Sequence, residues 1–590
     1  MKTSAERINS SASSELLRGP SSELLREPSS ELLRGPSSEL LREPSSELLR
    51  EPSSELLRGP NGHHHHTTIS MEKVPAERLT WQLLLVVFSA SFGAWFPIGY
   101  TYGVTNPIQN IVLQWIRTVQ CERYGVPAVI PDAELSNNTD NGNLVLRAEH
   151  PSELWCKLIP EEEESKMLDF NPELNTIWAL TGAAIASGAF ISLWSTGWWL
   201  SHFGSKQTLI YNNCIGLLGA VLTGMCVMVH SYELLIAGRF ILGFNIGIAV
   251  SVVPLFCTEI SPPNLRGTMG TVPGVMLVFG QFFAVVLGLP QLLGTADLWP
   301  IISWMRLLPC FVLFITIPFC PESPRYLLLQ RKDKVAARKA LVWLRGTDDV
   351  QAELTVIQKE GDVMSDDNKT VSVVGIFRDP FLRKAMVVCM VAIFSQQLSG
   401  IGPVTAYTNA IFLAAGLGKL EALYGTTGLF ALQVASVFLS MILLDRAGRR
   451  SLLLIGLVGS TVCVFSFLGF SLAGNYGGYQ WTTYANLGCV LAFIVVFNLG
   501  PAFIPWVLVG EMFSSSSRGA AMTLMSAGCH GVLAINTFLF PILQTFIGDW
   551  TFAIFGVCLV LGTTYLYTHL IETKGKQLDQ IQTELRQKLR

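Results

Sequence analysis

Residues 259–267 read EISPPNLRG and residues 511–519 read EMFSSSSRG, so both stretches hold a glutamate that is followed, after six residues, by Arg-Gly. Each stretch comes at the end of a long apolar run. Two further pairs recur at nearly the same separation, WLSHFGSKQ with LLDRAGRRS and PESPRYLLL with IETKGKQLD. Three repeated pairs in one order indicate two homologous halves, a parallel repeat that is typical of secondary transporters.

The composition points to a membrane protein. Hydrophobic residues make up 50% of the 590 residues and charged residues only 14%, whereas soluble globular proteins average about 25% charged. Charged residues concentrate in the first 80 residues, in 132–169, in 321–384 and in the last 20. The net charge is −3, so the chain has no overall positive charge that would attract nucleic acid, and we exclude a nucleic-acid partner.

Twelve apolar runs are long enough to cross a bilayer, which takes about 20 apolar residues per helix. The first run begins too late to be a cleavable signal peptide. The predicted spans lie at about residues 79–102, 175–200, 207–229, 232–257, 268–289, 299–320, 384–413, 422–444, 451–473, 484–510, 519–543 and 549–571. The predicted fold class is therefore an all-α polytopic membrane protein with twelve transmembrane helices in two pseudo-symmetric six-helix bundles.

Basic residues set the predicted orientation. Lys and Arg concentrate in the connection 321–384, whereas the short connections 290–298, 474–483 and 544–549 carry none. By the positive-inside rule, the basic connection and both termini are cytoplasmic. The predicted domains are a tail at 1–78, an amino-terminal bundle at 79–320, a linker at 321–383, a carboxy-terminal bundle at 384–571 and a tail at 572–590.

The loop 107–174 is then extracellular. It carries the sequon Asn137-Asn138-Thr139, which makes Asn137 a candidate for glycosylation. It also holds Cys121 and Cys156, and an oxidising compartment permits a disulfide between them. Two cysteines in one loop can also stay unpaired, and the sequence leaves both outcomes open. The other ten cysteines fall within or beside apolar runs, where a thiol behaves as a small hydrophobe.

The amino-terminal tail is repetitive. Residues 13–60 are six copies of SSELLR followed by Gly-Pro or Glu-Pro, and the recurring proline stops helix propagation, so we predict disorder. The repeat is either a tolerated expansion without a role in transport or a docking or phosphorylation tail, since each copy offers two serines. His63 to His66 could bind a metal weakly or be the remnant of an expression tag.

The three motif pairs lie at predicted cytoplasmic helix ends and mix acids with bases. A Glu that faces an Arg on a neighbouring helix lowers the cost of a charge near the membrane and forms a contact that movement can break. We predict a latch that holds the cytoplasmic side shut in the outward-open state. The alternative is that these charges only set topology and cap helices. The predicted latch residues are Glu259, Arg266, Glu322, Arg325, Asp445, Arg446, Arg449, Arg450, Glu511 and Arg518.

Six ordered motifs resemble the signature set of the facilitative glucose transporter family, which belongs to the sugar porters of the major facilitator superfamily. They are GRFILGFNIGIAVSVVPLFCTEISPPNLRG (238–267), PESPRYLLL (321–329), QQLSGI (396–401), DRAGRR (445–450), GPAFIPW (500–506) and ETKGK (572–576). The resemblance covers about residues 79–580. It implies two bundles joined by a cytoplasmic helical linker, supplied here by 325–378, and alternating access for a solute the size of a monosaccharide.

The sugar site is expected between the bundles. Sugars are held by side chains that donate and accept hydrogen bonds and by aromatic faces. Gln396 and Gln397 supply amides, although hydrogen bonds between neighbouring helices would also account for them. The resemblance implies that Trp506 lies against the sugar, with a core or lipid-facing Trp as the alternative. Prolines let that helix bend, and the predicted gating residues are Tyr407, Pro501 and Pro505.

Several positions depart from the family's glucose carriers. Gly274 stands where those carriers have a Gln, and Gly402 where an Asn follows QQLSGI. Each lost amide or aromatic contact is worth about 1 kcal/mol, so tight glucose recognition is not expected. The predicted substrate-binding residues are Gln396, Gln397, Gln433 in place of an Asn, Asn498 in place of a Glu, Trp506, and His530, which with Cys529 replaces an Asn-Trp pair.

His530 has three open roles: substrate contact, a neutral hydrogen bond between helices, and proton coupling. Proton-driven relatives carry an Asp after the Gly-Tyr pair of the first span, where this chain has Thr101, and Thr80 to Ile111 contains no Asp, Glu or His. Uniport is therefore the predicted mode.

We predict facilitated diffusion of a monosaccharide, a hexose, by a protein of the plasma membrane that works as a monomer, with the sugar and the lipid bilayer as its partners. No Walker A pattern, nucleophile and base arrangement, metal site or cofactor site is present, so an enzyme is not expected. The open alternatives are a uniporter of fructose, dehydroascorbate, urate or a polyol, a proton-coupled sugar symporter, and a transporter-like sugar sensor.

Overall fold

The computed structural model describes residues 79–123, 139–140, 143–144, 172–262, 264–366, 371–414, 416–479, 481–576, 580–581 and 583–584. Four sequence predictions fall outside these residues: the octapeptide repeats, His63 to His66, glycosylation at Asn137, and the role of Cys156.

Six spans form the amino-terminal half. They are α1 (Trp81–Ala90) continued through a π-helical turn (Ser91–Trp95) into α2 (Phe96–Gly103), then α7 (Pro172–Leu193), α8 (Thr196–Met225), α9 (Tyr232–Ile260), α10 (Arg266–Leu287), and α11 (Trp299–Met305) continued by α12 (Leu307–Thr316). Within this half α7 and α8 both pack on α9, and α10 packs on α2.

Six further spans form the carboxy-terminal half. They are α16 (Pro380–Gln396) continued into α17 (Gly402–Ala414), α18 (Lys419–Arg446), α19 (Arg449–Gly477), α20 (Trp481–Leu499) continued into α21 (Ile504–Met512), α22 (Ser515–Ile547) and α23 (Thr551–His569). The described residues contain eleven apolar helical stretches of membrane-spanning length, and the last, Ser516–His569, holds both α22 and α23. A short 3-10 turn (Gly548–Trp550) separates these two helices, so the twelve predicted spans are confirmed.

The linker between the halves is helical, as predicted. It contains α13 (Lys334–Arg345), α14 (Gln351–Asp366) and α15 (Val373–Arg378). Asp333 caps α13 by accepting from the N–H groups of Val335 and Ala336, and Ser372 caps α15 in the same way. These caps pair backbone N–H groups in the first turns of α13 and α15 that have no partner within the helix.

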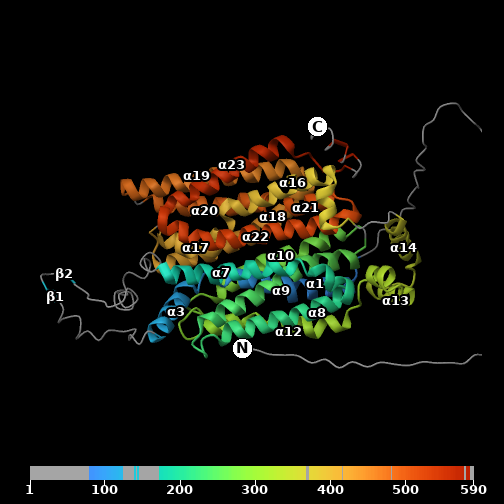
Figure 1. The fold of residues 1–590 in the computed structure, drawn as a ribbon, viewed down its shortest axis with the longest axis horizontal. Helices are drawn as coiled ribbons and strands as arrows, with labels where there is room; N and C mark the ends of the chain where they lie inside the picture. Colours follow the sequence, from blue (N-terminus) through green and yellow to red (C-terminus); the bar gives the residue numbers. More distant parts are fainter. Residues whose placement is uncertain are drawn as a thin grey trace, which may run out of the picture. The chain divides into compact units, whose positions relative to one another are not determined.

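One helix was not predicted. α3 (Gln109–Arg123) lies in the loop that follows the first span, ahead of a two-stranded antiparallel pair, β1 (Thr139–Asp140) and β2 (Asn143–Leu144). α3 and the linker helices lie at opposite ends of the bundle (Figure 1). We call these the α3 end and the linker end.

Two spans of the carboxy-terminal half are interrupted within their length. Between α16 and α17 a π-helical turn (Gln397–Ile401) places Gly400 at φ +88°, a conformation that favours glycine. A Cβ at Gly400 would also lie 2.9 Å from the ring of Phe555. The break thus falls one turn before Pro403, which lies at the start of α17 where a proline costs little. Between α20 and α21 the chain turns at Gly500-Pro501.

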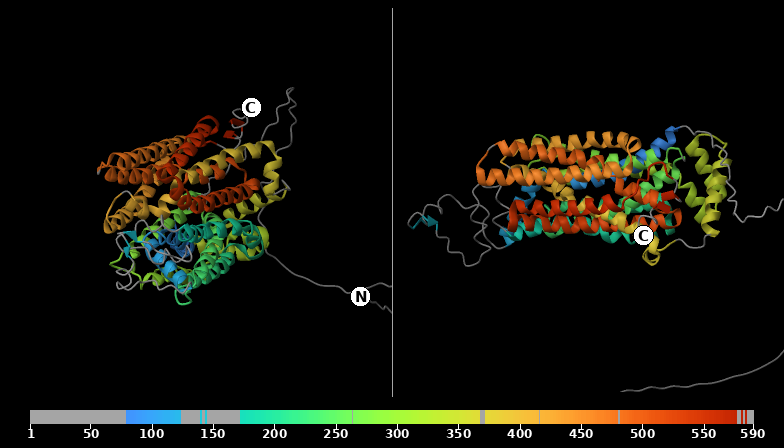
Figure 2. Two further views of the ribbon diagram at one scale, coloured as in Figure 1. Left: turned by 60° about the vertical axis from the view of Figure 1, so that its left-hand side comes forward. Right: turned by 90° about the horizontal axis from the view of Figure 1, so that it is seen from above.

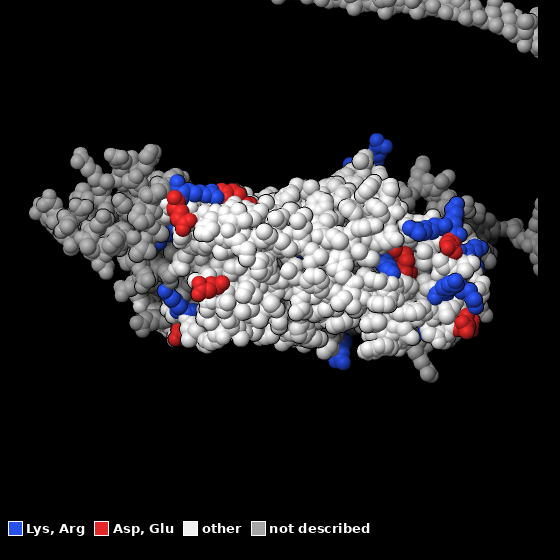
Figure 3. Space-filling view, turned by 90° about the horizontal axis from the view of Figure 1, so that it is seen from below, with Lys and Arg blue, Asp and Glu red and all other residues white. Residues whose placement is uncertain are grey.

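The two halves lie side by side, and both further views show the same arrangement (Figures 1 and 2). They meet where α7 packs against α22 and where α10 packs against α18. On the face drawn in Figure 3, acidic and basic side chains gather towards the two ends, and few lie in the broad band between them. This is the distribution that a bilayer requires of a spanning surface.

Candidate functional site

The break between α16 and α17 presents two buried amides. Gln396 Nε2 donates to the carbonyl of Ala502, 2.9 Å away, which lies in the turn between α20 and α21. Gln396 Oε1 is buried and has no hydrogen-bond partner among the described residues. Gln397 Nε2 lies 2.9 Å from Cys529 Sγ, and its backbone carbonyl accepts from Asn536 Nδ2 at 2.7 Å. Each broken helix therefore offers polar groups that a continuous helix would have used internally.

A third amide faces the opposite half. Gln433 on α18 donates from Nε2 to Gln281 Oε1 on α10, at 3.2 Å. Its own Oε1 is buried and finds no partner in the part of the chain that the structure describes. Gln281 was not predicted as a site residue. A buried glutamine in the middle of the apolar run MLVFGQFFAVV was the signal that could have identified it.

Three other predicted site residues have the following contacts. Asn498 Nδ2 donates to Ser436 Oγ at 3.3 Å, and Ser436 Oγ in turn donates to the carbonyl of Gln433 at 2.9 Å, so Asn498 and Gln433 are linked. Trp506 is partly buried against a hydrophobic cluster to which both halves contribute. His530 Nδ1 lies 2.9 Å from the carbonyl of Ser526 in its own helix.

Tyr407, one of the three predicted gating residues, lies near the place where α17 meets α22. Its hydroxyl donates to the carbonyl of Thr537 at 3.4 Å, and its ring stacks on Phe540 with centroids 5.4 Å apart. The ring faces the amino-terminal half as well, because a Cβ at Gly182 on α7 would lie 3.7 Å from the tyrosine oxygen. A gating role for Tyr407, Pro501 and Pro505 stays a prediction.

Comparison with known proteins identifies the family. The family model described as "Sugar (and other) transporter" matches residues 86–585. The chain belongs to this sugar transporter family. Facilitated glucose transporter member 2 of Rattus norvegicus is 32% identical over 519 residues, which cover 87% of this chain and 95% of the relative. Facilitated glucose transporter member 3 of Homo sapiens is 31% identical over 508 residues, covering 86% and 92%.

Solved structures support the same fold. The xylose transporter XylE from E. coli, in an inward-open conformation, aligns with a TM-score of 0.62 at 18% identity and covers 85% of this chain and 99% of that one. The proton:xylose symporter XylE bound to 6-bromo-6-deoxy-D-glucose aligns with a TM-score of 0.63 at 18% identity, covering 86% and 100%. The fold of this sugar transporter is thus the major facilitator fold, as predicted. Its relatives are transporters and not enzymes.

At the α3 end, polar side chains join the two halves of the sugar transporter. Asn106 Nδ2 donates to the carbonyl of Thr405 at 2.5 Å, and Asn106 Oδ1 accepts from the N–H of Asn409 at 3.0 Å. Asn175 Nδ2 donates to Thr545 Oγ1 at 2.8 Å and to the carbonyl of Pro541 at 3.2 Å. None of these residues was predicted. Because these bonds cross between the halves, they must break if the α3 end opens.

We expect Asn106→Leu to favour the conformation that is open at the α3 end. The change removes two hydrogen bonds from a side chain that is fully buried, worth together about 2 kcal/mol or roughly a 30-fold shift in the equilibrium. Spin labels at Leu292 and Leu420, both exposed, would report a longer distance. Thr118→Val, which removes an exposed bond within α3, is the control. An unchanged distance distribution would contradict the prediction.

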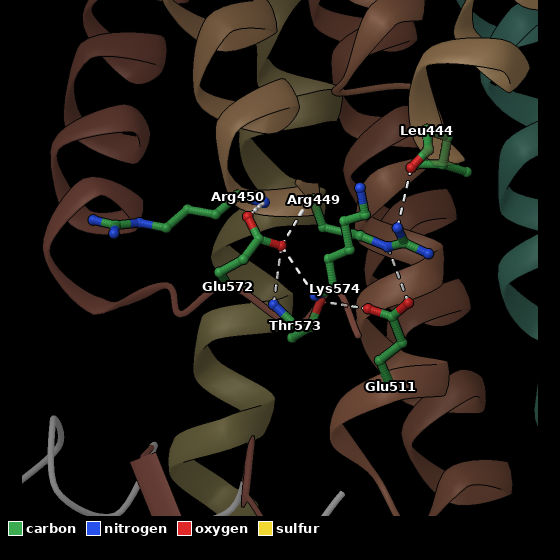
Figure 4. A network of polar contacts seen from close by, with 7 residues as sticks. All are labelled: Leu444, Arg449, Arg450, Glu511, Glu572, Thr573 and Lys574. Carbon is green, nitrogen blue, oxygen red and sulfur yellow. Dashed lines mark hydrogen bonds and ion pairs between the residues drawn. The ribbon is translucent and has the colours of Figure 1, made fainter. Parts of the chain in front are cut away.

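At the linker end, the carboxy-terminal half holds a polar network (Figure 4). Glu572 Oε1 accepts from the N–H of Arg449 at 2.8 Å, and Oε2 accepts from the N–H of Arg450 at 3.1 Å, which caps the start of α19. Arg449 Nε forms an ion pair with Glu511 Oε1 at 3.1 Å. Glu511 also accepts from the hydroxyl of Thr573.

The amino-terminal half repeats this geometry. Glu322 Oε1 accepts from the N–H of Lys206 at 2.9 Å, just after Gly204 with φ +79° interrupts α8. Burial raises the pKa of the Glu322 carboxyl, and the backbone N–H groups of Lys206 and Ser323 act in the opposite direction. Ser205 Oγ donates to Glu259 Oε2 at 3.2 Å. Sequence repetition therefore corresponds to a repeated structure, in which a carboxylate from the end of one helix caps the start of another.

The remaining predicted latch residues make other contacts. Arg266 Nε and Arg518 Nη2 each donate to the carbonyl five residues earlier, at 3.5 and 3.3 Å. Arg450 Nη2 donates to the carbonyl of Tyr567, and Lys574 Nζ donates to the carbonyl of Arg446. Arg325 lies close enough to Glu259 for their charges to interact. The side chain of Asp445 lies outside the described residues. The contacts named here join residues of one half, so a latch between the halves stays a prediction.

The cysteines follow the sequence pattern. Cys121, at the end of α3, is disulfide-bonded. Its predicted partner, Cys156, lies outside the described residues. The ten cysteines in or beside the spans are free thiols.

Proposed function

We propose that this protein catalyses facilitated diffusion of a hexose by alternating access of its two halves. The observation that carries the proposal is the pair of buried amide oxygens, Gln396 Oε1 and Gln433 Oε1, which find no hydrogen-bond partner among the described residues. An unpaired buried acceptor costs about 1–3 kcal/mol. A solute with hydroxyl donors would satisfy both oxygens, which supports a hydroxyl-rich solute such as a hexose.

Two features support uniport over proton coupling. The first span, Trp81–Gly103, contains no Asp, Glu or His. His530, the titratable residue of the predicted site, bonds through Nδ1 to a carbonyl of its own helix. One of the similar structures is a proton symporter and the relatives are facilitated transporters, so the evidence for the mode comes from this chain's own residues.

Liposomes that contain the purified protein test the function. Uptake of radiolabelled glucose, fructose, galactose and urate would be measured with and without an inward proton gradient. We expect saturable uptake of at least one hexose that the gradient does not accelerate. No saturable uptake of any hexose would overturn the proposal. Acceleration by the gradient that is lost in His530→Ala would replace uniport with symport.

Adding an amide at position 402 should improve glucose binding. Gly402 follows the break at Gly400, and a Cβ there would lie 2.8 Å from Leu533 Cδ1, the flexible end of a side chain that can turn aside. We expect Gly402→Asn to raise glucose affinity about 5-fold, the equivalent of one net hydrogen bond of about 1 kcal/mol. Competition binding would measure the gain. Leu533→Ala is the matched control, and no gain in Gly402→Asn or in the double variant would contradict the prediction.

We also propose that the linker end is cytoplasmic, with both termini on that side, and that the protein resides in the plasma membrane as a functional monomer. The basic linker helices lie at one end and α3 with its disulfide at the other (Figure 1), which supports this orientation. Glycosidase sensitivity that disappears in Asn137→Gln, together with labelling by an impermeant reagent on intact cells, would test it. Resistance to both the glycosidase and the impermeant reagent would contradict the proposed orientation or the proposed location.

A further inference from the structure

A buried arginine lies within the sixth span of the amino-terminal half. Arg306 stands between α11 and α12, seven residues after Trp299, whose ring packs against Trp115 of α3. Seven helical residues correspond to about 10 Å, so Arg306 lies about 10 Å from the α3 end of its span. It is 2% exposed. A charged side chain at this depth in a membrane span is costly and marks a candidate functional site.

The guanidinium of Arg306 points into the bundle. A long basic side chain near the end of a span usually extends to the membrane surface, where water solvates its charge. Arg306 Nη2 instead donates to Asn245 Oδ1 on α9, 2.6 Å away. Asn245 follows Tyr232, the first residue of α9 at the α3 end, by thirteen residues or about 20 Å. The guanidinium is therefore held among the helices and not at the membrane surface.

The neighbouring helix α8 fixes the orientation of the Asn245 amide. Asn245 Nδ2 donates to the carbonyl of Asn212 on α8 at 2.7 Å, and Asn212 Nδ2 donates to the carbonyl of Asn245 at 3.0 Å. Because the amide nitrogen of Asn245 is bonded to α8, the amide oxygen is the group that faces Arg306. This contact satisfies one guanidinium nitrogen with a neutral acceptor and leaves the positive charge unbalanced.

The charge of Arg306 has no carboxylate partner in the part of the chain that the structure describes. The ionisable groups close enough to act on it are a thiol, Cys310, and a phenol, Tyr102. Arg306 Nε and Nη1 are buried without a hydrogen-bond partner among the described residues, and so is the hydroxyl of Tyr102. Two guanidinium nitrogens and one hydroxyl thus offer donors, near a single positive charge, that no protein acceptor uses.

We propose that a small monovalent inorganic anion, such as chloride, binds in the amino-terminal half at Arg306 and Tyr102. An anion accepts hydrogen bonds from all three free donors and also balances the charge, which a water molecule would not do. A buried guanidinium without a partner is strongly destabilising, whereas a paired one with satisfied hydrogen bonds is tolerated. Tyr102 also lies close enough to Cys529 for the two groups to interact, so the anion site lies beside the carboxy-terminal half.

Thermal unfolding of the purified full-length protein tests the site. Sodium chloride would replace the bulkier sodium isethionate in steps, at constant ionic strength. For the wild type, we expect chloride to raise the midpoint temperature by about 2–4 °C and the rise to saturate. Arg306→Leu should unfold at one temperature in both salts. Arg306→Lys, which keeps the charge with fewer donors, should keep part of the response and serves if the Leu variant does not fold.

Arg123→Leu is the matched control. Arg123 forms a two-point ion pair with Glu233 at an exposed position, with Nη1 and Nη2 at 2.5 and 2.8 Å from the carboxylate oxygens. Its loss removes an arginine but leaves Arg306 in place, so the chloride response should equal that of the wild type. Tyr102→Phe removes one donor and should raise the half-saturating chloride concentration about 5-fold.

Two outcomes would overturn the anion site. The first is a wild type whose midpoint temperature is the same in both salts. The second is an Arg306→Leu variant that keeps the full chloride response, because chloride would then act elsewhere on the protein. Neither measurement involves a sugar, so the anion site and the proposed hexose transport can fail independently.

Discussion

We expect Glu353→Ala to destabilise the linker by about 3–5 kcal/mol, the cost of breaking a buried ion pair by removing one of its two members. Arg345 and Glu353 form a two-point ion pair, with Nε to Oε2 at 3.0 Å and Nη2 to Oε1 at 2.7 Å, and their side chains are 5% and 7% exposed. Arg345 Nη1 also donates to the carbonyl of Ile260 at the end of α9, 2.9 Å away. Loss of the Glu353 carboxylate removes the two-point ion pair and leaves the bond to this carbonyl in place.

Hydrogen exchange of α13 and α14 in the full-length protein would measure the loss. The double variant Arg345→Leu/Glu353→Leu should lose far less than Glu353→Ala, because it removes both charges together. It should still lose about 1 kcal/mol from the bond to Ile260. A double variant less stable than the single one would contradict the argument. Asp349→Ala, which removes an exposed carboxylate from the connection between α13 and α14, is the control for a lost carboxylate alone.

Most of the fold could be predicted because the bilayer imposes lengths that hydropathy reveals. The separation of α22 from α23 is an example, because the sequence predicted a short connection at 544–549 within an otherwise continuous apolar region. α3 was missed because it lies in a polar loop and is too polar to register as a span. Its buried Val112 and Ile116, four residues apart, carried a helical signal that a search for spans does not use.

The site was harder to predict than the fold. Gln396, Gln397 and Gln433 were predicted because a motif and the family resemblance pointed to them, and their role in solute binding stays a prediction. Gln281 and Asn106 were missed, because each meets a residue that is distant in sequence and belongs to the other half. Where a helix is apolar on all sides, periodicity does not define which face meets the other half. That choice depends on the packing of both bundles.

We expect Glu572→Ala to slow transport strongly by releasing the start of α19. Gly448 occupies the position before α19 where a capping side chain normally lies, and a glycine has none. Glu572 supplies the missing cap from the other side, through the N–H groups of Arg449 and Arg450 (Figure 4). A lost cap costs up to about 2 kcal/mol, and here it also frees Arg449, which holds Glu511. Initial uptake rates in liposomes would measure the effect.

Gly448→Ala separates this account from a simple loss of charge. A Cβ at Gly448 would lie 2.1 Å from Glu572 Oε2, so an alanine there must push the carboxylate away while leaving every charge in place. We therefore expect Gly448→Ala to slow transport about as much as Glu572→Ala, and the double variant to be no slower than either, since both remove one interaction. Additive losses would show that the two residues act separately. Gly510→Ala, whose added Cβ meets nothing within 4 Å, is the control and should transport normally.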